Sequence, residues 1–172
     1  MPRLLVTPLS SLPEALKTHA PTHLVSLLSP EHMIGTPDGF PAAGHLRIGV
    51  NDIIDPAAGT APPLRRHIED LLTFSRTWDA RSPMVIHCWA GISRSMASAF
   101  TILCDRLWPD REIEIARAIR QRAPHAQPNR LLVQHADDAL GRGGRMIAAL
   151  NSMGPPVVVE EGVTTAFPLV GL

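Results

Sequence analysis

One stretch near the middle of the chain combines residue types that could do chemistry, the run from Val85 to Ser95 (VIHCWAGISRS). An apolar segment ends at a cysteine, a short glycine-containing loop follows, and a small-residue segment typical of a helix begins beside an arginine. We expect the backbone N–H groups of the loop and of the helix N-terminus to point at one spot and form an anion site. Gly91 lets the loop turn without steric cost, and Arg94 can hold two phosphate oxygens with its planar guanidinium.

The cysteine of this run, Cys88, would lie at the floor of the anion site. Positive potential there favours the thiolate, so we expect a nucleophile near neutral pH. The alternative is a buried cysteine and a surface arginine that happen to be six residues apart. Cys104 is expected in the core, or else as a thiol that protects Cys88 from oxidation. Two cysteines do not make a disulfide framework.

The elements that must position this loop follow from the pattern of apolar segments along the chain. Strands alternate with helical patterns, which predicts an α/β fold with a mostly parallel central sheet flanked by helices in a single domain. The expected strands are residues 4–6, 23–28, 45–50 and 84–86. The expected helices are residues 12–19, 64–78 and 95–108, one capped by Asp110 that ends near residue 123, and one from residue 128 to the glycines at 141–144, which residues 146–150 could resume.

Length and charge exclude several functional classes. The chain has 172 residues, which suits one domain. Lys plus Arg and Asp plus Glu each number 16, and this neutrality disfavours a broad electrostatic grip on nucleic acid or anionic membrane. No apolar run approaches the roughly 18–20 residues that span a bilayer, and Pro8 and Pro13 make the N-terminus a poor signal peptide. We therefore expect a soluble, cytoplasmic protein with no nucleic-acid or membrane partner.

The run from His87 to Ser95 resembles the signature loop of the cysteine-based protein tyrosine phosphatase superfamily, in which His-Cys is followed by five residues and Arg-Ser. The variant Ala-Gly-Ile-Ser-Arg-Ser is most similar to the compact dual-specificity branch and its small bacterial relatives. Residues 120–124 (RQRAP), with Pro128 and Asn129, also look like a later segment of that branch.

The resemblance covers residues 1–150, which we expect to form the phosphatase domain. It leaves residues 151–172 as a C-terminal tail of uncertain structure. Within this tail, residues 155–172 are apolar without a helical period. They could form an edge strand, cover the core or be disordered.

The resemblance implies a role for each residue of the loop. Cys88 would attack phosphorus and form a cysteinyl-phosphate, and Ser95 would stabilise the leaving thiolate. His87 would fix the cysteine backbone without touching substrate. No metal or cofactor would be needed. The residues expected to hold the phosphate oxygens are Trp89, Ala90, Gly91, Ile92, Ser93 and Arg94.

A general acid must protonate the leaving oxygen. In the resembled branch, this aspartate follows the strand that comes before the signature loop. Asp52, 36 residues before Cys88, directly follows the expected strand 45–50. Asp55, 33 residues before Cys88, fits the branch's spacing slightly better. We favour Asp52 and keep Asp55 as the alternative.

Several other residues have two interpretations. The tripeptide 108–110 (WPD) matches the acid loop of larger tyrosine phosphatases, but it follows the signature loop, so Asp110 is interpreted as a helix cap. Trp89 would line the mouth of the pocket or, as the larger alternative, pack against a neighbouring helix. Asn129 would hydrogen-bond to the signature loop or cap the last helix. The histidines expected at the surface or at caps are His45, His125 and His135.

These observations predict a metal-independent phosphomonoester hydrolase acting on a phosphorylated protein or peptide. Phosphotyrosine is the expected substrate, with phosphoserine or phosphothreonine also possible, and inorganic phosphate or sulfate would bind in the site. The loop lacks the lysines that phosphoinositide phosphatases of the superfamily usually carry, which argues against a highly charged lipid headgroup. The alternatives are a phosphate-binding relative without catalysis, a phosphatase of a non-protein ester and a rhodanese-type sulfurtransferase. The His-Cys pair and the Arg-Ser ending argue against the last.

Overall fold

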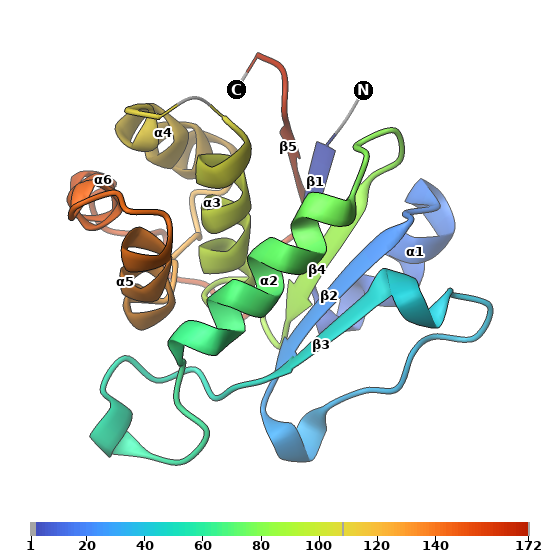
Figure 1. Ribbon diagram of the computed structural model, residues 1–172. Coiled ribbons are helices and arrows are strands. Elements are labelled where there is room, and N and C mark those ends of the chain that lie inside the picture. Colours follow the sequence, from blue (N-terminus) through green and yellow to red (C-terminus); the bar gives the residue numbers. More distant parts are fainter. Residues whose placement is uncertain (1–2, 108, 172) are drawn as a thin grey trace.

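The computed structural model describes residues 3–107 and 109–171. The predicted start of the domain at residue 1, the predicted end of the helix at residue 108 and the end of the tail at residue 172 therefore lie outside the described residues. A five-stranded sheet with the order β3-β2-β4-β1-β5 forms its centre (Figure 1). Neighbouring strands are parallel except at β5, which runs antiparallel to β1. The predicted α/β class is confirmed. The strands are β1 (Arg3–Pro8), β2 (His23–Leu28), β3 (His45–Gly49), β4 (Met84–Cys88) and β5 (Thr165–Pro168).

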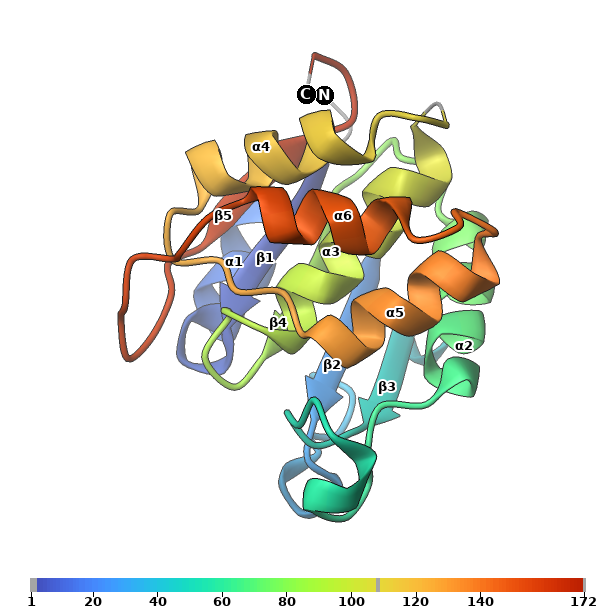
Figure 2. The same ribbon diagram turned by 90° about the vertical axis from the view of Figure 1, so that its left-hand side faces the viewer.

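Helices cover both faces of the sheet. One face carries α1 and the other carries the remaining five helices, with α4 and α6 side by side in the outer layer (Figures 1 and 2). The helices are α1 (Leu12–His19), α2 (Arg65–Thr77), α3 (Arg94–Arg106), α4 (Glu112–Arg122), α5 (Arg130–Ala139) and α6 (Arg145–Ser152). Among the described residues, none of these helices has both the length and the hydropathy to cross a bilayer.

Successive residues of the central strands point to opposite faces of the sheet. Because both faces are covered, the central strands β1, β2 and β4 are mostly apolar instead of alternating with polar residues, and Thr7, Ser26 and His87 are their buried polar residues. The side chains buried against α2–α6 include Leu4, Val6, Val25, Leu27, Met84 and Ile86. Those buried on the α1 side are Leu5, Leu24 and Val85, together with Leu12 of α1 itself.

The prediction that Asp110 caps the fourth helix is wrong. The residue before α4 is Arg111, and Asp110 has a φ of 69°. Its carboxylate lies 3.3 Å from Arg145 Nε. Negative charge in the first turn of α4 comes instead from Glu112 and Glu114, which favours the helix N-terminus.

The last predicted helix is two helices. Residues 140–144 separate α5 from α6, and Gly141, Gly143 and Gly144 all have positive φ. A right-handed helix does not continue through such angles, so residues 146–150 belong to a separate element. α5 itself begins at Arg130, after an N-cap at Asn129.

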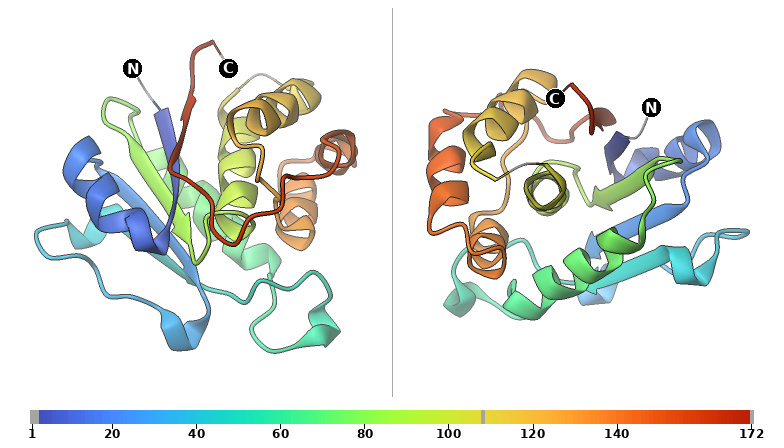
Figure 3. Two further views of the ribbon diagram at one scale, coloured as in Figure 1. Left: turned by 180° about the vertical axis from the view of Figure 1, so that it is seen from behind. Right: turned by 45° about the horizontal axis from the view of Figure 1, so that its top comes forward.

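The C-terminal segment returns to the sheet. Of residues 155–172, residues 165–168 form β5 at the edge beside β1, and Phe167 pairs with Leu4 and is fully buried. Before reaching β5, the segment passes next to the loop that follows β4 (Figure 3).

The four parallel strands end at one edge of the sheet, and this edge brings the predicted residues together. β4 ends at Cys88, which pairs in register with Pro8 at the end of β1. Val50 and Asp52 follow the end of β3. In open parallel sheets, ligands bind at this carboxyl edge.

Candidate active site

Three other parts of the chain donate hydrogen bonds to the backbone carbonyl groups of the loop between β4 and α3. Four of its carbonyl oxygens point outward and accept from backbone N–H groups. Trp89 O accepts from Leu9 at 3.0 Å and Ala90 O from Gly162 at 2.8 Å. The other two pairs are Ile92 O with Gln127 N (3.0 Å) and Ser93 O with Asn129 N (3.3 Å).

These outward carbonyls orient the N–H groups of the loop. In a trans peptide the C=O and the next residue's N–H point in opposite directions. The N–H groups of residues 90, 91, 93 and 94 therefore face the inside of the loop. Ser93 also leaves the N-terminus of α3 uncapped, because its hydroxyl makes no hydrogen bond to the helix backbone. The loop and the helix end thus form a concave array of donors suited to an anion.

Gly91 is required at its position in this array. Its φ is +70°, in the left-handed region that glycine adopts readily. A Cβ there would also lie 2.8 Å from Pro8 N and 3.0 Å from the carbonyl carbon of Thr7. The end of β1 thus leaves room for a glycine only.

Cys88 lies at the base of the array with two polar partners of the predicted site. Its Sγ is 3.1 Å from Ser95 Oγ, and both residues are buried. Arg94 is only 6% exposed; its Nη1 donates to Val50 O at 2.8 Å, and its buried Nε has no hydrogen-bond partner. A buried guanidinium nitrogen without an acceptor is costly unless an anion supplies one.

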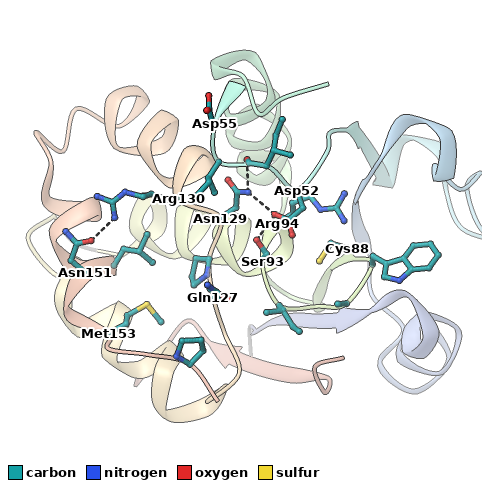
Figure 4. A pocket seen from close by; sticks show the side chains of 18 of the residues that line it. Asp52, Asp55, Cys88, Ser93, Arg94, Gln127, Asn129, Arg130, Asn151 and Met153 are labelled. Atoms are coloured by element: carbon teal, nitrogen blue, oxygen red, sulfur yellow. Dashed lines mark hydrogen bonds between the residues drawn. The ribbon is translucent and has the colours of Figure 1, made fainter. Parts of the chain in front are cut away.

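Asp52 is held against the same loop by two side-chain donors. Ser93 Oγ donates to its Oδ1 at 2.7 Å, and Asn129 Nδ2 donates to the same oxygen at 2.8 Å (Figure 4). Asn129 is itself fixed, because its Oδ1 accepts from Leu132 N at 3.0 Å at the start of α5. Both interpretations of Asn129 are therefore realised in part: its side chain caps α5, and its backbone N–H reaches the signature loop.

Asp55, the alternative acid, does a different job. Its Oδ1 accepts from Ala57 N at 2.9 Å and so closes the short 3-10 turn over Pro56–Ala58. It lines the same cavity, but its carboxylate points away from Cys88 (Figure 4). The geometry favours Asp52 as the carboxyl group beside the cysteine.

A cavity of about 940 Å³ opens above Cys88 and Arg94. Trp89 stands at its mouth, 55% exposed, and its ring makes an edge-to-face contact with the His32 ring at a centroid distance of 5.5 Å. Trp89 therefore lines the cavity as expected, and it also contacts His32 of the short 3-10 helix Pro30–His32, so both interpretations of Trp89 apply in part.

The fold of this chain resembles known structures, although comparison of its sequence finds no relative. No family model matches the sequence, and no curated protein matches it. The structure of DUSP15 superposes with a TM-score of 0.64 at 20% identity, covering 88% of this chain and 92% of that one. Human DUSP28 gives a TM-score of 0.54 at 23% identity, covering 81% and 94%. PTPMT1 in complex with PI(5)P gives a TM-score of 0.52 at 17% identity, covering 80% and 90%.

The chain has the dual-specificity phosphatase fold. The fold predicted from the signature loop is thus confirmed. At these identities the likeness extends to the fold alone, so the chemistry has to be argued from the site itself.

Behind the signature loop of this phosphatase fold lies a chain of buried and partly buried hydrogen bonds. Ser26 Oγ is 2.6 Å from His87 Nε2 and 2.8 Å from His45 Nε2. His45 Nδ1 is 3.0 Å from Thr36 Oγ1, and His87 Nδ1 is 3.4 Å from Cys88 O. One arrangement of protons satisfies every pair: each imidazole is neutral, and each group donates once toward Cys88 O. His45 itself is half-buried. The expectation that His125 is a surface or capping residue is wrong for its position, because His125 is buried.

We expect this network to make the fold sensitive to acid. Burial lowers the pKa of both His87 and His45 to about 4, from an ordinary value of 6.5. Between pH 6.5 and 4, the unfolded chain binds protons that the folded protein excludes. The free energy of unfolding should therefore fall as the pH drops through this window, by up to about 1.4 kcal/mol per pH unit for each histidine.

Urea unfolding at several pH values between 7.5 and 5 measures this slope. His45→Gln, which removes one titrating group, should flatten it. An unfolding free energy that stays constant over this range would contradict the burial of neutral histidines.

The second cysteine, Cys104, lies outside the site. Burial raises the pKa of the Cys104 thiol well above its ordinary value, and the charge of Glu112 adds to this. Cys104 lies nine residues beyond Ser95 on α3, about 13 Å along the helix axis. A disulfide needs Cα atoms within about 7 Å, so Cys104 does not reach Cys88. In the described ranges, no group of three or more His, Cys, Asp or Glu side chains is arranged to hold a metal.

The structure also adds residues that sequence reasoning missed. Ser26 is a polar residue within the otherwise apolar strand 23–28, and that break in the pattern could have marked it. Gly162 and Arg130 gave no such signal, because their importance depends on what lies beside them in space.

Proposed function

We propose that this protein is a phosphomonoester hydrolase, a protein tyrosine phosphatase that works through a cysteinyl-phosphate. The observation that carries the proposal is the position of Cys88 Sγ. It lies at the base of a ring of inward N–H groups, beside a buried guanidinium whose Nε lacks an acceptor. A phosphate placed there would receive backbone donors from the loop and two further N–H groups from Arg94.

In the first step, the Cys88 thiolate attacks phosphorus and forms the S–P bond as the bond to the ester oxygen breaks. The electron pair of that bond goes to the leaving oxygen. The Asp52 carboxyl, held by Ser93 and Asn129, transfers its proton to this oxygen and becomes a carboxylate. His87 acts through its contact with the Cys88 carbonyl and does not touch the substrate.

In the second step, water replaces the departed group. The Asp52 carboxylate takes a proton from the water as its oxygen attacks phosphorus, which releases inorganic phosphate and breaks the S–P bond. The thiolate that leaves receives a hydrogen bond from Ser95 Oγ, 3.1 Å away. The two steps together return Asp52 to its protonated form and Cys88 to its thiolate. The residues proposed to act need no metal or cofactor.

The substrate class follows from the shape and charge of the cavity. The site is open, Trp89 stands at the mouth, and Arg94 is the cation nearest the cysteine among the lining residues. This suits a phosphorylated side chain of a protein, phosphotyrosine first and phosphoserine or phosphothreonine as well. The similarity to DUSP15 and DUSP28, named as dual-specificity phosphatases, supports this assignment.

The test is hydrolysis of p-nitrophenyl phosphate and of a phosphotyrosine peptide with EDTA present. Acid quenching followed by mass spectrometry should find one phosphoryl group on the peptide that contains Cys88. Binding of phosphate or vanadate without any turnover would instead establish a phosphate-binding protein. Turnover of thiosulfate without phosphatase activity would establish a sulfurtransferase.

The C-terminal segment is expected to affect activity through Gly162, whose N–H holds the Ala90 carbonyl outward. A Cβ on Gly162 would lie 2.6 Å from His125 Nε2 and 3.2 Å from Gly91 O. We expect Gly162→Ala to displace the loop, to lower kcat/KM by roughly tenfold and to weaken vanadate binding, since about 1.4 kcal/mol of lost oxyanion stabilisation has this effect.

The control is the double variant Gly162→Ala with His125→Ala, which removes the clashing ring and should recover most of the vanadate affinity. Melting temperature separates a shifted loop from a destabilised fold. If Gly162→Ala matches the unchanged protein in kcat/KM and vanadate affinity, the segment does not position the loop.

A further inference from the structure

The cavity is larger than one phosphate group requires. Its volume of about 940 Å³ lies in the range of sites that hold whole drug-sized ligands. Cys88 and Arg94 form one end. The other end lies beyond Asn129, where the start of α5 faces the end of α6, and Arg130 and Asn151 meet there (Figure 4).

Arg130 places a positive charge at that far end. It is the first residue of α5, where the helix dipole disfavours a cation. Its Nη1 donates to Asn151 Oδ1 at 2.7 Å, a neutral acceptor. Among the described residues, no carboxylate forms an ion pair with it, so its charge is not compensated.

Arg120 adds a second positive charge to the same end. Its guanidinium donates to the carbonyl oxygens of Pro124 at 2.6 Å, Met153 at 3.3 Å and Gly154 at 3.3 Å. These carbonyls fix the group in place without neutralising it. Exposed arginines outside the cavity, such as Arg117, lack this arrangement. Arg120 and Arg130 both line the cavity that contains Cys88.

Apolar side chains lie along the same part of the cavity. Leu150, Met153 and Pro156 line it together with the two arginines. A ligand that fills the whole cavity would carry a phosphate at the Cys88 end, an apolar portion and an anionic group at the Arg130 end. An extended phosphopeptide has this form, because successive side chains reach separate parts of one groove.

We propose that the Arg130 end of the cavity is an anion subsite that binds an acidic side chain of a phosphopeptide while its phosphorylated residue lies over Cys88. The proposal rests on the proposed function and names its substrate class more closely: phosphopeptides with a glutamate or aspartate near the phosphorylated residue. Arg130 makes the contact, and Arg120 contributes through its charge.

The experiment measures kcat/KM on matched phosphotyrosine peptides in which one flanking alanine at a time is replaced by glutamate. The protein is expected to prefer glutamate at one or two positions by roughly threefold to fivefold, the size of a partly exposed ion pair. Arg130→Ala should remove this preference, and Arg130→Glu should shift it toward peptides with lysine at the same positions. Added salt should weaken the preference, since the site is open to solvent.

The matched control is Arg117→Ala, an exposed arginine on α4 outside the cavity, which should leave the preference intact. Equal kcat/KM for all peptides would overturn the subsite while leaving the phosphatase assignment standing. Failure to release phosphate from any peptide or from p-nitrophenyl phosphate would overturn the assignment itself. An Arg130-dependent preference for a soluble bisphosphorylated inositol headgroup over every glutamate peptide would overturn the choice of a peptide ligand.

Discussion

Cys88→Ser is expected to lose at least about 10⁴-fold in kcat on p-nitrophenyl phosphate, because it removes the thiolate that forms the covalent intermediate. A serine hydroxyl is a much weaker nucleophile than a thiolate near neutral pH. The loop donors are backbone groups held by Leu9, Gly162 and Gln127, and the substitution leaves them in place. Initial rates with EDTA present, compared with those of the unchanged protein, give the measurement.

Two further measurements make this result specific. The serine variant should still bind inorganic phosphate or sulfate by calorimetry within about tenfold of the unchanged affinity, since the anion array and Arg94 remain. Cys104→Ser should keep the full rate, because the Cys104 thiol is buried and lies away from the site. Substantial turnover by Cys88→Ser would refute the cysteinyl-phosphate intermediate.

Asp52→Ala is expected to lower kcat by roughly 10²–10⁴-fold on a substrate with a poor leaving group, the usual contribution of a general acid. Asp55→Ala should cost far less, because that carboxylate closes the turn at Pro56 and points away from Cys88. Both variants lose one negative charge at the cavity rim, so each is the other's control for charge. The comparison therefore isolates position.

Comparing substrates with different leaving groups separates a general acid from a residue that only supports the structure. Phenolate with a nitro group leaves without full protonation, whereas the alkoxide of phosphoserine needs the proton. The loss in Asp52→Ala should therefore be larger on an alkyl phosphate than on p-nitrophenyl phosphate. Equal losses on both substrates, or a larger loss in Asp55→Ala, would move the acid away from Asp52.

The strands and helices were predictable because each has a local cause. The apolar strand segments have both faces covered, so their composition marks them directly. The boundary at Asp110 failed for the opposite reason. Asp110 is a good cap by residue type, but its carboxylate pairs with Arg145 from α6, a contact that no local pattern contains. The glycines at 141–144 predict an end to the helix but not the direction of the chain after it, because glycine permits many backbone conformations.

The sequence by itself determined the anion loop: a cysteine at the end of a buried strand, a glycine for the left-handed turn, and an arginine at the start of a helix. These depend on neighbours along the chain, and the structure places them as expected. Only the tertiary structure decided what surrounds the loop. It holds Asp52 against the loop through Ser93 and Asn129, and this could not be predicted, because spacing along the chain does not say where a carboxylate points. It also brought Gly162 and Arg130 to the site, because contacts between distant segments arise only when the sheet and helices pack.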